Sequence, residues 1–174
     1  MTLASVLDSE THKRLIEDMP TICQQAGVPA NYIQQSMRNH CGEADCKWVI
    51  NFKRLNETKY SGLTLVGDHL EVRSLALAGA LIRNFIDARV YTLQRVIDEH
   101  PTPTVLIIPN FYISAIDCKP HHSWKIDQIY SLLLDRMSLG LQTVIGVTDM
   151  KNMEAVYGTN IVKHLRDNYV MSGG

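Results

Sequence analysis

Short apolar runs alternate with longer helical stretches along the second half of the sequence, and this alternation limits the possible folds. The runs are short enough to be strands buried on both faces, and they lie at residues 63–66, 90–93, 104–108 and 143–147. Helical patterns separate or follow them, over about 70–86, 124–139, 153–157 and 161–169. Parallel strands need such crossover helices, so the sequence predicts an α/β fold with a mostly parallel sheet and helices on both faces.

Individual residues predict where some of these elements begin and end. Pro109 follows the apolar run 104–108 and is expected to end that strand. Ser123 is expected to cap the helix over 124–139, and Gly140 to end it in the left-handed conformation.

The first part of the chain has a different pattern, which we interpret as a helical arm. Four apolar residues recur on one side of its first helical stretch, Leu7, Leu15, Ile16 and Met19. Ser5 and Asp8 have the spacing of a capping box at its start. Residues 48–50 (Trp-Val-Ile) predict a short strand. The expected division is a helical N-terminal arm and linker over 1–45 and an α/β core over 46–174.

Composition excludes several classes of protein. With 17 Lys and Arg against 18 Asp and Glu, the net charge is −1, so only a local basic patch could attract nucleic acid or an anionic membrane. No apolar run approaches the roughly 18 residues that span a bilayer, and no signal peptide is recognisable at the start. Four cysteines do not make a disulfide framework in a chain of 174 residues. A cytoplasmic protein without a membrane partner is expected.

The junction between the first predicted strand and the long helix can be compared with a phosphate-binding loop. In the pattern G-x-x-x-x-G-K-[ST], Gly67 supplies the first glycine and Ser74 the hydroxyl. Val72 replaces the second glycine and Arg73 replaces the lysine. Residues 67–74 are therefore interpreted as a degenerate loop of this kind.

Two acidic residues in this loop weaken the case for nucleotide binding further. Asp68 is expected to cap the long helix, and Glu71 to lie in its first turn. These carboxylates would occupy the place of the phosphate oxygens and repel a triphosphate.

Four segments of the sequence can be compared with a known family: residues 27–32 (GVPANY), 129–136 (IYSLLLDR), 143–145 (TVI) and 158–165 (GTNIVKHL). In this order they resemble segments of the ATPase core of bacterial replicative-helicase loaders of the DnaC/DnaI type and of the related transposon helper ATPases of the IstB type. The resemblance covers most of the chain, from about 27 to 165. It implies a P-loop NTPase-like, AAA+-type core, a role in DNA replication, and a replicative helicase or an AAA+ helicase loader as the partner.

The departures from this family pattern concern ATP hydrolysis. Pro109 and Asn110 stand where the family has acidic residues for Mg²⁺ and the attacking water, and Asn160 and His164 replace two arginines. Phosphoryl transfer depends on such cations and oriented donors. The resemblance therefore implies a core without a working ATPase site, with neither ATP nor Mg²⁺ as cofactor. The alternative is a divergent ATPase that uses Arg73 and Ser74.

Two surfaces are candidates for binding partners. By resemblance, the arm residues Leu7, Leu15 and Ile16 would engage the helicase; alternatively, the arm packs on its own core. Lys119, Trp124 and Lys125 combine cations with a ring that stacks on bases, which suits single-stranded DNA. The alternative, which we favour, is a plain loop whose Trp124 packs into the core.

Three weaker patterns remain. His40, Cys41 and Cys46 suggest zinc, with Cys23 or His12 as fourth ligand, but their spacing is outside the usual range and no metal site is expected. Acid–base chemistry by Asp117 with His121 or His122 lacks a nucleophile at a fixed spacing. Residues 38–59 carry five basic against three acidic residues, which is typical of a solvated surface.

The sequence as a whole predicts a helicase-loader-like protein of DNA replication that acts by protein–protein contact rather than by catalysis. A divergent ATP-binding loader and a single-stranded-DNA-binding module are the alternatives. A homo-oligomer is left open.

Overall fold

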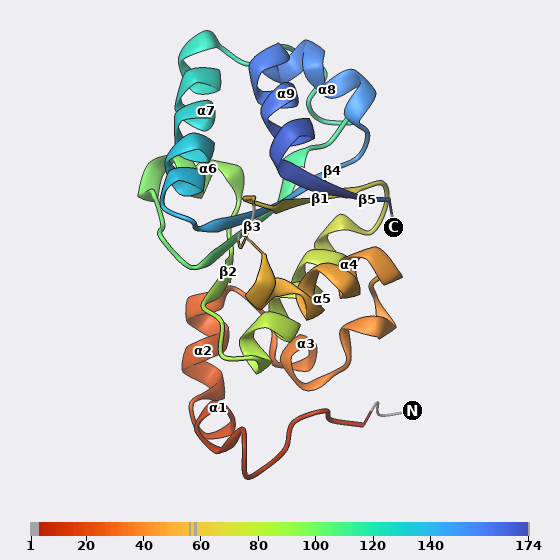
Figure 1. Ribbon diagram of the computed structural model, residues 1–174, viewed down its shortest axis with the longest axis vertical. Coiled ribbons are helices and arrows are strands. Elements are labelled where there is room, and N and C mark those ends of the chain that lie inside the picture. Colours follow the sequence, from red (N-terminus) through yellow and green to blue (C-terminus); the bar gives the residue numbers. More distant parts are fainter. Residues whose placement is uncertain (1–3, 56, 58, 174) are drawn as a thin grey trace.

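The computed structural model describes residues 4–55, 57 and 59–173, and a parallel sheet lies at its centre (Figure 1). The sheet has five strands in the order β2-β3-β4-β1-β5, and all of its neighbouring pairs are parallel. The strands are β1 (Gly62–Val66), β2 (Ala88–Val90), β3 (Val105–Tyr112), β4 (Gln142–Val147) and β5 (Tyr169–Gly173). The predicted α/β fold is confirmed.

The helices cover both faces of this sheet, in two groups that follow the order of the chain (Figure 1). The first group is α1 (Lys13–Glu17), α2 (Met19–Ala26), α3 (Ala30–Gln34), η1 (Met37–Asn39), α4 (Glu43–Ile50), η2 (Phe52–Arg54) and α5 (Leu70–Arg83). The second group is α6 (Leu93–Glu99), α7 (Ser123–Ser138), α8 (Met150–Tyr157) and α9 (Thr159–Asn168). None of the helices described is both long and apolar enough to cross a membrane.

Alternate residues of each central strand pack against opposite groups of helices. Val105 and Ile107 belong to the cluster that contains the buried residues of α5, whereas Leu106 and Ile108 belong to the cluster that contains those of α7 and α9. A strand that is buried on both faces shows a continuous apolar run rather than an alternating pattern. The apolar runs in the sequence therefore identified the central strands.

Strand β3 continues past Pro109 to Tyr112, so the expectation that this proline ends the strand is wrong. Proline cannot donate to a ladder, but the pairing of β3 with β4 is irregular between Ile108 and Tyr112, and proline is tolerated at such a bulge. On the neighbouring strand, a Cβ at Gly146 would collide with the Pro109 carbonyl. The glycine thus allows the two backbones to approach.

Residues 48–50 form the end of α4 instead of the expected strand. Glu43 and Asp45 lie in the first turn of this helix, where carboxylates are favourable, and Trp48 is buried by its packing. Tertiary packing therefore overrides the β-propensity of the Trp-Val-Ile run.

Other predicted boundaries are shifted. No helix begins at Ser5; the Asp8 carboxylate instead accepts hydrogen bonds from the N–H groups of residues 10 and 11 in a turn, and the first helix starts at Lys13. Ser123 is the first residue of α7 rather than its cap, whereas Gly140 has the expected left-handed conformation (φ 68°). Strand β5 was not expected, because its residues carry no strong apolar run.

Residues 4–45 pack against the sheet rather than extending from it. Leu15, Met19 and Ile33 are buried in the same cluster as Leu63 and Leu77. The expected boundary between residues 45 and 46 falls inside α4, so there is no linker at that point. A continuous apolar cluster explains this, because exposing it would cost about 25 cal/mol per Å² of apolar surface.

A close contact between α3 and α5 gives a first prediction. The only helical glycine among the described residues, Gly79, faces the Tyr32 carbonyl so closely that a Cβ would collide with it. We expect Gly79→Ala to destabilise the protein by about 1–3 kcal/mol through overpacking, although alanine is the better helix former. Thermal unfolding measures this, with Ser131→Ala on the exposed face of α7 as the control. A higher melting temperature for Gly79→Ala would show that α3 moves away at little cost.

Candidate functional site

The turn from β1 into α5 is the position of the phosphate-binding loop in this type of fold. Gly67 has φ of 106° and His69 has φ of 55°, both in the left-handed region. His69 is the N-cap of α5 and makes no side-chain capping bond, so the expectation that Asp68 caps this helix is wrong. Asp68 is one residue too early and its side chain is exposed.

Arg73, at the position of the P-loop lysine, is withdrawn into the protein and only 3% exposed. Its Nε and Nη2 atoms donate to the two carboxylate oxygens of Asp45, at 3.0 and 3.1 Å. Nη1 donates to the Val66 carbonyl at 3.0 Å, and Nη2 also donates to the Ser172 carbonyl at 3.0 Å. All three guanidinium nitrogens are thus engaged inside the protein.

The anion beside this cation comes from a helix far away in the sequence. Asp45 lies on α4, is fully buried, and also accepts a hydrogen bond from the Ser172 hydroxyl on β5. The network therefore joins α4, α5 and the ends of β1 and β5. Sequence reasoning missed Asp45, because a lone acid in a polar segment gives no signal, and assigned the role of an internal anion to Asp68 and Glu71 instead.

Ser74 is the other P-loop position, and its hydroxyl is buried without a hydrogen-bond partner among the described atoms. A hydroxyl at this position could serve as an oxygen ligand of Mg²⁺. A groove of about 660 Å³ lies over the loop, and its single anionic side chain is Asp68. With the guanidinium of Arg73 already paired, this groove offers poor electrostatic support to a triphosphate. The residues present do not fit Mg-ATP.

The other positions that hydrolysis would need are Asn110, in place of an acidic residue, and Thr148 and Asp149, near which the resemblance places the polar residue that senses the γ-phosphate. Asn110 is exposed on β3. The Thr148 hydroxyl accepts a hydrogen bond from the Ser114 N–H at 2.9 Å, and Asp149 caps α8 by accepting from the Asn152 N–H at 2.9 Å. The bond between Ser114 and Thr148 joins the loops that follow β3 and β4.

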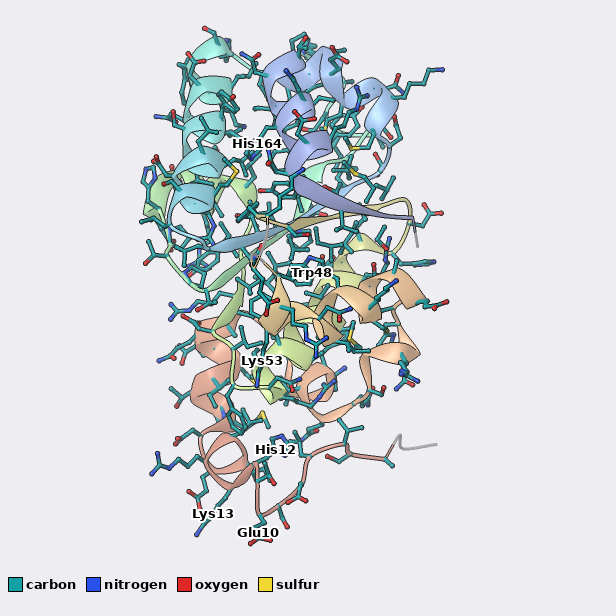
Figure 2. All side chains as sticks on the ribbon, viewed as in Figure 1. Glu10, His12, Lys13, Trp48, Lys53 and His164 are labelled. Atoms are coloured by element: carbon teal, nitrogen blue, oxygen red, sulfur yellow. The ribbon has the colours of Figure 1, made fainter. Side chains whose placement is uncertain are left out.

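Of the two positions where the family has arginines, Asn160 is exposed and His164 is buried. His164 is 6% exposed, and Figure 2 shows it on the side of the sheet that carries α7–α9, opposite Trp48. Its ring contacts those of Tyr130 and Tyr169, and Nε2 has no hydrogen-bond partner among the described residues. Burial lowers the pKa of His164 below its ordinary value.

This burial predicts how stability depends on pH. The unfolded chain binds a proton at His164 with a pKa near 6.5, more readily than the folded protein does. The stability is therefore complete above about pH 6.5 and is lost as the pH falls below it, because the unfolded state takes up the proton first. We expect His164→Asn to flatten this slope in urea unfolding between about pH 7 and 5, whereas His122→Asn, at an exposed position, should keep it. Equal slopes for the wild type and His164→Asn would contradict the assignment.

A second groove, of about 490 Å³, follows β3 and contains the residues expected to bind single-stranded DNA. Trp124 is 58% exposed, so the expectation of a tryptophan packed into the core is wrong. Lys119, Lys125 and the 74% exposed Ile116 line the same groove. The Asp117 carboxylate accepts a hydrogen bond from the Ile113 N–H at 2.8 Å, a structural task rather than an acid–base one.

The arm residues proposed to bind a partner are separated by the fold. Leu15 is 5% exposed within the core, Leu7 packs partly against it, and Ile16 is 44% exposed. Of these three residues, only Ile16 has an exposed side chain. The alternative expectation, in which the arm packs on its own core, describes the structure better.

The cysteines considered as zinc ligands have other surroundings. The Cys41 thiol donates to the Arg73 carbonyl, and burial raises its pKa to about 12. His12 bonds the Arg83 carbonyl through Nε2 at 3.1 Å. Within the ranges described, no three His, Cys, Asp or Glu side chains converge on one point.

Comparison with solved structures identifies the architecture. The chain is similar to DnaI (TM-score 0.59, 16% identity, 84% of this chain and 94% of that one) and to the DnaC helicase loader (TM-score 0.58, 13% identity, 82% and 98%). It is also similar to the replication initiator DnaA bound to AMPPCP and single-stranded DNA (TM-score 0.58, 10% identity, 78% and 49%). The protein has the AAA+-type fold of these replication proteins.

The comparisons are informative about the fold alone. No protein-family model matches the sequence, and no similar sequence is found among curated proteins. The chain spans nearly the whole of the DnaC and DnaI structures but about half the length of the DnaA chain and of a DNA replication initiation factor. Because one fold hosts many functions, the activity has to be argued from the site.

Proposed function

We propose that this protein is a helicase-loader-like module of DNA replication that acts by binding a replicative helicase or an AAA+ helicase loader and does not hydrolyse ATP. The fold, shared with DnaC and DnaI, supports a role in DNA replication. The proposed lack of ATP hydrolysis rests on the buried ion pair between Arg73 and Asp45, which engages the cation at the P-loop lysine position.

A phosphate bound at the loop would have to displace the existing partners of Arg73. A triphosphate could recruit Arg73 only by breaking the two Asp45 bonds and leaving that carboxylate buried and unpaired, which is strongly unfavourable. The two positions where the family has acidic metal ligands hold Pro109 and Asn110, which lie within β3 and carry no carboxylate. Nucleotide binding would therefore gain few favourable contacts and would break the buried ion pair between Arg73 and Asp45.

The test is a pull-down of tagged protein from bacterial lysate, with and without Mg-ATP, read by mass spectrometry, together with calorimetry of Mg-ATP binding to the purified chain. We expect a replicative helicase or its loader to be recovered equally in both conditions, and no heat of nucleotide binding. Capture only with Mg-ATP, or measurable turnover, would favour a divergent ATPase. Recovery of neither protein would leave the similarity as one of fold alone.

A second candidate function, binding of single-stranded DNA, is favoured by the exposure of Trp124 beside two lysines. An indole that is 58% exposed can stack on a base, and Lys119 and Lys125 can contact phosphates. The chain has two tryptophans, and the other, Trp48, is 3% exposed, so quenching of fluorescence by oligo(dT) would report on Trp124.

Substitutions separate a DNA-binding role from a merely exposed side chain. Trp124→Ala and Lys125→Ala are expected to weaken oligo(dT) binding, which should also fall with salt. Leu139→Ala is the matched control, because Leu139 is 68% exposed at the other end of α7. Unchanged oligo(dT) binding by Trp124→Ala would remove this candidate.

A further inference from the structure

A groove between η1 and α4 lies outside both sites described above. It has a volume of about 530 Å³ and is lined by Arg38, Cys41, Gly42, Glu43, Cys46, Lys47 and Ile50. Its apolar wall ends at Ile50, whose side chain is 71% exposed at the end of α4. The groove thus combines an exposed aliphatic group with two cationic side chains, Arg38 and Lys47, and one acidic side chain, Glu43.

The fold makes the stretch around this groove more basic than the sequence suggests. Residues 38–59 contain five basic and three acidic residues, but Asp45 is turned inward to Arg73 and fully buried. The exposed charged residues of this stretch are then five cations and two acids, Glu43 and Glu57, within a chain whose net charge is −1. In the described part of the chain, no ion pair involves any of these five, in contrast to the paired Arg89 and Arg95.

We infer that this groove docks an acidic amphipathic segment of a partner protein. An apolar side chain of the segment would pack against Ile50 and the groove wall, and its carboxylates would face Arg38 and Lys47. A single nucleic-acid strand fits less well, because the two aromatic residues of α4 and η2 are not available as stacking surfaces. Trp48 is buried, and Phe52 packs against its ring edge at 5.5 Å between centroids.

This inference rests on the proposed function as a partner-binding module, and it assigns the binding of the partner to the η1–α4 groove. The arm residues expected to serve this purpose are mostly taken up by the core, since Leu15 is buried and Leu7 packs against the same cluster. The η1–α4 groove instead presents three exposed side chains, Arg38, Lys47 and Ile50.

Fluorescence anisotropy with defined peptides tests the groove directly. The probes are a short labelled peptide of Leu and Glu in an amphipathic pattern, its Leu/Lys counterpart, its Ser/Glu counterpart, and labelled oligo(dT). We expect the Leu/Glu peptide to bind at least about tenfold more tightly than the other peptides, with an affinity that falls as salt rises.

The variants are Arg38→Glu/Lys47→Glu, which reverses the charge, and Ile50→Ser, which removes the apolar contact. Each should weaken binding of the Leu/Glu peptide by about tenfold or more. Lys151→Glu/Lys163→Glu, at exposed positions of α8 and α9, is the charge-matched control and should bind like the wild type. Because all these side chains are exposed, unchanged thermal unfolding verifies that each variant is folded.

Equal binding of the Leu/Glu and Leu/Lys peptides, or binding unaffected by the groove variants, would overturn the inference. Loss of oligo(dT) binding in Arg38→Glu/Lys47→Glu without any peptide binding would assign the surface to nucleic acid. The same variants in the lysate pull-down separate the two proposals. If the wild type and the groove variants capture the helicase or loader equally, the docking site is wrong and the proposed function stands; if the wild type captures neither, the proposed function fails.

Discussion

Replacing Asp45 with alanine is expected to lower the free energy of unfolding by about 3–5 kcal/mol, the largest effect of any single substitution proposed for this protein. The variant would leave the guanidinium of Arg73 buried without its counter-charge. Removing one partner of a buried pair costs far more than the pair itself contributes, because the remaining charge has lost both water and its partner.

Urea unfolding of three variants separates this explanation from a general loss of packing. Asp45→Ala/Arg73→Met removes both charges and should recover part of the stability that Asp45→Ala loses. Asp87→Ala breaks the exposed pair between Asp87 and Arg89, whose side chains are 48% and 37% exposed, and should cost no more than about 1 kcal/mol. If Asp45→Ala cost no more than Asp87→Ala, the buried pair would not be the structural element we describe.

Arg136→Met is expected to destabilise the protein by about 3 kcal/mol or more, because it removes donors from several buried acceptors. The Arg136 side chain on α7 is 4% exposed and has no carboxylate among its hydrogen-bond partners. It donates to the Thr143 hydroxyl at 2.9 Å and to the carbonyls of Pro103 and Gln142 at 3.0 and 2.7 Å. Each acceptor left unpaired costs about 1–3 kcal/mol, whereas the methionine replaces only the aliphatic contacts.

The same unfolding measurement with two further variants tests the role of the guanidinium. Arg166→Met, at an exposed position of α9, should change stability by less than about 0.5 kcal/mol. Arg136→Lys keeps the charge but not the planar fork, so it should restore only part of the loss. Full stability in Arg136→Lys would show that charge alone, rather than the array of hydrogen bonds, holds α7 to β4.

The sheet could be predicted from the sequence because its signal is local. A strand buried on both faces needs consecutive apolar residues, and 104–108 and 143–147 meet that need whatever surrounds them. The predicted element boundaries are wrong where contacts with a neighbouring element override the preference of the local sequence. Pro109 stays within β3 because Gly146 and an irregular register accommodate it, and residues 48–50 are helical because α4 buries Trp48.

The candidate site was predicted only in part. Gly67, Arg73 and Ser74 follow from their spacing, and so does the poor match to a phosphate-binding loop. The surroundings of these residues could not be predicted from spacing, since Arg73 forms an ion pair with Asp45, 28 residues away, and a hydrogen bond with Ser172, 99 residues away. Similarly, the spacing of Leu7, Leu15 and Ile16 gave no sign that Leu15 would be covered by the protein's own core.

The sequence by itself determined the α/β class, the order of the central elements and the replaced residues of the loop, because periodicity and spacing are properties of neighbouring residues. Only the tertiary structure decided which charges are buried together and which remain exposed. A buried arginine must find its acceptors wherever the chain brings them, and a surface becomes basic when one of its acids is turned inward. Such pairing depends on contacts between distant segments, which a linear pattern does not record.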